Sequence, residues 1–66
     1  MNPKYPDVTV QLIGQDGNAF YILGAVSKEL KKAGVSKEEI DVFMDEAMDG
    51  SYDHLLQTVM RYVEVE

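Results

Sequence analysis

The segment spanning residues 18–34 constrains the fold most, because it carries the complete pattern of one amphipathic helix. Asn18 is a favourable N-cap, since its side-chain oxygen can accept from a free backbone N–H of the first turn. Gly34 suits the left-handed residue that follows a helix end. Apolar residues recur at intervals of three and four and form one stripe, consisting of Ala19, Ile22, Leu23, Val26, Leu30 and Ala33. We therefore expect the rest of the chain to pack on this helix.

Gly24 interrupts the same helix and costs about 1 kcal/mol relative to alanine. A close crossing of another helix at this position would explain the glycine, because a side chain would keep the two backbones apart. The sequence alone therefore suggests a helix crossing at Gly24.

The segment before this helix predicts a strand. Val8, Val10 and Leu12 alternate with polar residues within residues 7–13, which is typical of a half-buried strand. Residues 14–17 are rich in glycine and predict a turn. Two prolines make residues 1–6 a poor start for any regular element, so we expect a flexible extended arm there.

The segment after the first helix predicts a second helix, packed against the first as a hairpin. Ser36 and Glu39 match a capping box, in which each side chain bonds to the other residue's backbone N–H. The helix is expected to end at Asp49 and Gly50. Its inner face is predicted to carry Ile40, Phe43, Met44 and Ala47.

A third helix is expected to follow, capped by either Ser51 or Asp53. Its predicted inner face carries Leu55, Leu56, Val59 and Met60. Residues 62–66 alternate again, which favours a short C-terminal strand beside the first one. The alternative is a third helix that continues to about Val63 and frays.

These elements predict a single α+β domain over residues 7–66, with the order β-α-α-α-β and a helical bundle packed on a two-stranded sheet. The chain has 66 residues and no cysteine. A core of this size is marginal, and small domains often gain stability by associating. We therefore expect a homodimer in which two sheets pair edge to edge and cover exposed strand edges. The expected dimer edge comprises Val8, Val10, Leu12, Val63 and Val65.

The formal net charge of −6 is distributed unevenly. Residues 1–37 contain five lysines and three acids, whereas residues 38–66 contain nine acids and one arginine. Such an acidic half disfavours binding to nucleic acid and to anionic membranes, both of which require basic residues. It favours a basic protein surface as a partner. No signal pattern or membrane-length apolar segment occurs, so we expect a cytoplasmic protein.

A row of acids on the second predicted helix is the candidate docking surface. Like charges four residues apart repel one another, so the row costs some stability. A simple solvated face is the competing interpretation. The tyrosines at positions 5, 21, 52 and 62 are candidate contact anchors or residues at the edge of the core. The candidate partner-binding residues are Glu38, Asp41, Asp45, Glu46 and Asp49.

The sequence predicts no catalytic, cofactor or metal site. A calcium-loop frame that starts at Asp45 has Ala47 and Leu56 where oxygen ligands are required. His54 has no nucleophile at a suitable spacing, so a structural or surface role is favoured over a general base. The turn at residues 14–18 lacks the lysine of a nucleotide-binding loop.

Several short segments also carry a resemblance to other proteins. They are Gly-Asn-Ala-Phe at residues 17–20, Ile-Leu-Gly at 22–24, Ala-Gly-Val at 33–35, Tyr-Asp-His-Leu-Leu at 52–56 and Val-Glu-Val-Glu at 63–66. In these segments the chain resembles a group of short bacterial and phage proteins. The resemblance brings no catalytic residues. It implies one functional class, small proteins that inhibit a bacterial defence protein by occupying its surface.

We therefore expect a small acidic, non-enzymatic module that binds a protein and forms a homodimer. Two alternatives stay open. One is a structural or regulatory domain whose acidity serves solubility. The other is a dimer that sequesters a small molecule.

Overall fold

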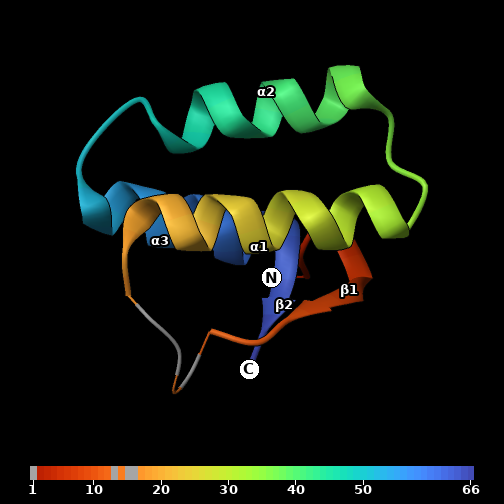
Figure 1. Cartoon of the computed structure of the whole chain (residues 1–66), viewed down its shortest axis with the longest axis horizontal. Coiled ribbons are helices and arrows are strands. Elements are labelled where there is room, and N and C mark those ends of the chain that lie inside the picture. The colour runs from red at the N-terminus through yellow and green to blue at the C-terminus, as the bar shows by residue number, and fades with distance from the viewer. Residues whose placement is uncertain (1, 13, 15–16) are drawn as a thin grey trace.

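Figure 1 shows a computed structural model of the chain, which describes residues 2–12, 14 and 17–66. The predicted order and α+β class are confirmed. The sheet lies at one side, α1 and α3 lie above it, and α2 forms the outermost layer (Figure 1). The elements are β1 (Tyr5–Val10), α1 (Ala19–Lys32), α2 (Lys37–Ala47), α3 (Tyr52–Tyr62) and β2 (Val63–Val65).

The two strands pair in parallel, with Val10 opposite Val65. The Glu66 N–H donates to the Val10 carbonyl oxygen at 3.0 Å, and the Lys4 N–H donates to the Arg61 carbonyl oxygen at 2.8 Å. The predicted pairing of the terminal segments is thus confirmed. β2 follows α3 without a loop, so the third helix runs almost to Val63, as one alternative held, and the strand then begins at Val63.

β1 starts at Tyr5, two residues earlier than predicted, so the arm expected over residues 1–6 is correspondingly shorter. The pairing register is irregular between Tyr5 and Thr9. Pro6 lies within this irregular part, where a residue without an N–H is tolerated. Ile13, Gln15 and Asp16, which belonged to the predicted strand and turn, lie outside the described residues.

Local capping explains where the helices begin and end. The Asn18 side chain accepts from the Phe20 N–H at 2.8 Å, which confirms the predicted cap of α1. Ser51, rather than Asp53, caps α3 by accepting from the His54 N–H at 3.2 Å. Gly34 adopts a φ of 86°, and the Val35 N–H returns to the Leu30 carbonyl oxygen at 3.0 Å. This is the Schellman arrangement that ends α1 and turns the chain toward α2.

The core lies between the three helices and the inner face of the sheet. Most of the predicted apolar stripe of α1 is buried, but Ala33 is exposed. On α3, the prediction for Met60 was wrong, because this side chain is 56% exposed. Thr58 is fully buried, and its hydroxyl is satisfied by donating to the His54 carbonyl oxygen at 2.8 Å. The buried core consists of Val8, Val10, Ile22, Leu23, Val26, Leu30, Phe43, Ala47, Leu55, Val59 and Val63.

Gly24 lies on the exposed side of α1. A Cβ built at this position would meet no atom within 4 Å. Among the described residues, the close helix crossing suggested from the sequence is therefore not formed at Gly24.

Candidate functional site

The outer side of α2 and the turn that follows it carry a row of acidic side chains. Its carboxylates recur at spacings of three and four, and all are exposed. Within the part of the chain that the structure describes, none of them takes part in the observed ion pairs. Val42 lies among them and is 59% exposed. We call this surface the acidic face, defined by Glu38, Asp41, Val42, Asp45 and Asp49.

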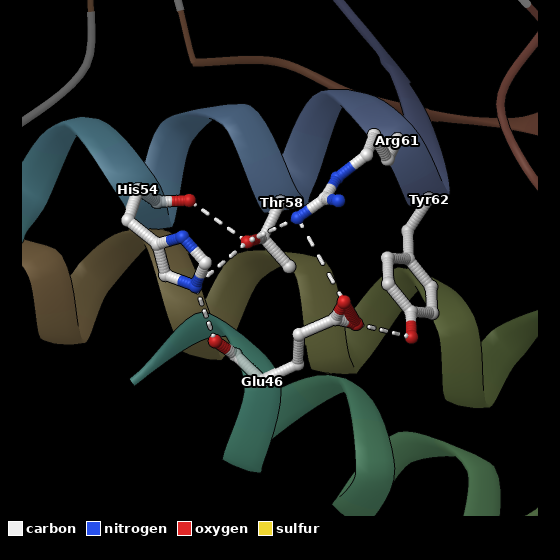
Figure 2. Close-up of polar contacts among 5 residues, drawn as sticks. All are labelled: Glu46, His54, Thr58, Arg61 and Tyr62. Atoms are coloured by element: carbon white, nitrogen blue, oxygen red, sulfur yellow. Dashed lines mark hydrogen bonds and ion pairs between the residues drawn. The ribbon is translucent and has the colours of Figure 1, made fainter. Parts of the chain in front are cut away.

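Glu46, predicted to belong to the same docking row, instead points toward α3 (Figure 2). The Tyr62 hydroxyl donates to Glu46 Oε2 at 2.9 Å, and Arg61 Nη2 lies 3.7 Å from Glu46 Oε1. This carboxylate therefore joins α2 to α3, at a contact that we call the α2–α3 seam. The other four predicted docking acids take part in no ion pair among the described residues.

Tyr62 anchors that seam from the end of α3. Its ring packs edge-on against buried Phe43, with 5.0 Å between the ring centroids. Burial raises the pKa of Tyr62, and the hydrogen bond to Glu46 raises it further. Both effects favour the neutral phenol, which is the form that can donate to the carboxylate.

His54 also serves the α2–α3 connection. Its Nε2 lies 2.8 Å from the Glu46 carbonyl oxygen (Figure 2). A carbonyl oxygen only accepts, so Nε2 must carry the proton. The ring packs on Gly50, where an added Cβ would lie 2.9 Å from His54 Cγ. The histidine therefore closes the connection between two helices, in line with the structural role favoured from the sequence.

A second cluster ties the start of β1 to α2. The Tyr5 hydroxyl donates to the Glu39 carboxylate, and Lys4 Nζ lies 3.4 Å from Glu39 Oε2. The hydrogen bond to Glu39 raises the pKa of Tyr5 to about 12, with burial as the next cause. The same hydrogen bond is the main cause that lowers the pKa of Glu39. A hydrogen bond from Lys4 and the positive charge of Lys4 lower it further. Tyr5 also stacks on Tyr62, with 6.4 Å between the ring centroids.

The capping box predicted for α2 is only half formed. Ser36 Oγ accepts from the Glu39 N–H at 3.2 Å, as expected. The Glu39 side chain is held by Tyr5 and Lys4, and no bond back to Ser36 occurs among the described residues. The contact of Glu39 with Tyr5, 34 residues away, takes the place of the expected bond from Glu39 to Ser36.

The four tyrosines divide into two pairs. Tyr5 and Tyr62 are partly buried and pack against the core. Tyr21 and Tyr52 are more exposed, and the Tyr52 hydroxyl donates to the Gly17 carbonyl oxygen. The most exposed aromatic residue of the described chain is Phe20, at 82%. Its position off the apolar stripe of α1 was the sequence signal that could have identified it.

The side chains of the expected dimer edge face the chain's own core. Val8, Val10 and Val63 are buried, and Leu12 and Val65 are partly buried. Only the backbone of these strands would therefore be available for pairing with a second copy.

An open groove of about 650 Å³ lies between α1 and β1. Its lining residues are of mixed character and include Gln11, Tyr21 and Lys28. Among the residues described, no group of three or more His, Asp or Glu side chains is arranged to hold a metal ion. The described helices also include none with the length and apolarity needed to cross a membrane.

Comparisons with protein-family models, curated protein sequences and solved structures find no match to this chain.

Proposed function

We propose that this chain is a non-enzymatic protein-binding module whose acidic face docks on a basic protein surface. The observation that carries the proposal is the contrast between two sets of carboxylates on α2 and just after its end. Glu39 and Glu46 are held by partners within the chain, whereas the four acids of the acidic face have none among the described residues. In the part of the chain that the structure describes, no ion pair holds this second set in the fold.

The acidic face suits a protein partner for electrostatic reasons. Asp41 and Asp45 are four residues apart on α2, and such a like-charge pair costs a few tenths of a kcal/mol. Asp49 adds a third carboxylate just after the end of the helix. Lysine or arginine side chains of a partner would turn this repulsion into attraction. Exposed Val42 supplies an apolar point inside a charged rim, which is the usual anatomy of a binding surface.

The resemblance to short bacterial and phage proteins suggests one specific role of this kind. The partner would be a bacterial defence protein, and the module would inhibit it by covering a basic surface. An acidic helix would compete there with the anionic groups that such a surface ordinarily attracts.

Removal of the charges tests this proposal. The triple variant Asp41→Asn, Asp45→Asn, Asp49→Asn should lose capture of a basic partner from host lysate by at least tenfold. The matched control, Asp7→Asn, Glu64→Gln, Glu66→Gln, removes the same number of charges at exposed positions outside α2. The control should retain capture.

Equal capture by both triple variants and the wild type would show that the acidic face is not the docking surface. Equal loss in both would show that only the overall charge matters. Circular dichroism of each variant verifies that the fold is intact.

A further inference from the structure

The exposed side of α1 carries a surface of the opposite character. Phe20 and Tyr21 lie in its first turn, and lysines follow toward its end. Among the described residues, Lys28 and Lys31 form no ion pair, whereas Lys32 lies 3.7 Å from Glu29. We call this surface the basic face, defined by Phe20, Tyr21, Gly24, Lys28 and Lys31.

The basic face of α1 and the acidic face of α2 match when they are read in opposite directions. The lysines near the end of α1 correspond to Glu38 and Asp41 near the start of α2. The aromatic first turn of α1 corresponds to the last turn of α2, where Met48 is 57% exposed. Charge thus faces opposite charge, and apolar surface faces apolar surface. Antiparallel helix dipoles add to the attraction.

Because α1 and α2 form a hairpin, one symmetric dimer can bring each α1 against the α2 of the other copy. α1 and α2 run side by side in opposite directions, joined by residues 33–36 (Figure 1). If two copies face each other about a two-fold axis parallel to these helices, each α1 lies antiparallel on its partner's α2. Such an interface is isologous and closes as a dimer.

This arrangement would explain why position 24 is a glycine. In the same antiparallel order it corresponds to Asp45, in the last turn of α2. No atom lies within 4 Å of a Cβ built on Gly24, so the glycine leaves a notch on the exposed surface. A notch allows a second helix to approach more closely than any side chain would permit.

We propose that the partner of the acidic face is a second copy of this chain, which binds through its basic face. This inference rests on the proposed function, because it names an occupant for the same surface. A different basic protein would have to displace the second copy, so binding such a protein would convert the dimer into monomers.

The size of the molecule indicates how strong this dimer is. The principal extents are 25 × 24 × 23 Å. One face therefore offers about 600 Å² per copy, at the low end for specific interfaces. We expect a salt-sensitive dimer whose dissociation constant rises about tenfold between low and high ionic strength.

A charge-swap experiment tests the pairing by sedimentation equilibrium. The variant Lys28→Glu, Lys31→Glu should be monomeric, because acids then face acids. The variant Glu38→Lys, Asp41→Lys should be monomeric for the converse reason. An equimolar mixture of the two variants should form a heterodimer, since each interface then joins opposite charges again.

Three results would overturn the inference: a monomeric wild type at concentrations up to about 1 mM, charge variants that still dimerise, or a mixture that stays monomeric. Dimers that persist in both variants would point to the sheet edges instead. The proposed function is judged separately, because the Lys28→Glu, Lys31→Glu variant retains the acidic face. Capture of a different basic protein by that variant would support docking even if self-association failed.

Discussion

Two sides of α2 carry the same residue types and use them differently. On the side that faces β1 and α3, Glu39 and Glu46 accept hydrogen bonds from Tyr5 and Tyr62 and lie near Lys4 and Arg61. On the outer side, the acids have no such partners within the described chain. The first set joins elements distant in sequence, whereas the second faces solvent. The comparison teaches that position on the helix, and not residue type, decides which acids help to hold the fold together.

The largest difference between the two sides should appear at adjacent residues. Phe43 is fully buried and packs against Tyr62, whereas Val42 is exposed in the acidic face. Phe43→Ala should lower the free energy of unfolding by about 3–5 kcal/mol, which is enough to unfold a small domain. Val42→Ala should change it by less than about 0.5 kcal/mol. Denaturant titration measures the unfolding free energy of both variants. A loss of stability in Val42→Ala as large as in Phe43→Ala would mean that the two sides of α2 do not differ in this way.

Two glycines sharpen the same comparison. Alanine at Gly50 would press on the His54 ring and cost about 1–3 kcal/mol. Alanine at Gly24 meets nothing in the monomer and should stabilise α1 by about 0.5–1 kcal/mol. Thermal unfolding at a low protein concentration, where the monomer prevails, should therefore shift in opposite directions. A stabilising Gly50→Ala variant would mean that the His54 contact is unimportant.

A smaller effect is expected from neighbouring acids. Glu46→Ala removes the acceptor of the Tyr62 hydroxyl and should cost about 1 kcal/mol. Asp45→Ala removes an unpaired charge and should leave stability unchanged or slightly higher, because alanine favours the helix. Unfolding free energies at neutral pH make the comparison. If the two substitutions cost the same, the seam would not depend on Glu46.

The smallest effect concerns pH. The Tyr5 hydroxyl and Lys4 lower the pKa of Glu39 in the folded state below its ordinary value of 4.5. Glu39 therefore contributes stability that is fully present above that ordinary value. The contribution is lost as the pH falls through the lowered folded-state pKa. Glu39→Gln should reduce the loss of stability in acid, measured by unfolding at a series of pH values. An acid profile identical to that of the wild type would rule out this contribution.

The sequence predicted those features that depend on neighbouring residues. The caps at Asn18 and Ser36, the glycine that ends α1 and most of its apolar stripe were all visible as short-range patterns. Position-by-position spacing failed on α3, where Thr58 is buried and Met60 is exposed. A hydroxyl that bonds its own helix backbone can be buried at little cost, and spacing alone does not reveal this.

The candidate site was predicted as one row of acids but consists of two sets. Glu46 was included in the docking row because spacing along a helix does not show which side a neighbouring helix will cover. The partners of Glu39 and Glu46 lie 34 and 16 residues away along the chain. Contacts at such separations are formed by the tertiary fold. The early start of β1 has the same origin, because Tyr5 is held by Glu39 of α2.

The most direct test of the division between the two sides is the unfolding free energy of the Asp41→Asn, Asp45→Asn, Asp49→Asn variant as a monomer. We predict a value equal to that of the wild type or higher by a few tenths of a kcal/mol, because repulsion along α2 is relieved. A loss of more than about 1 kcal/mol would contradict the account. It would mean that the outer acids, like Glu39 and Glu46, hold the fold together and are not reserved for a partner.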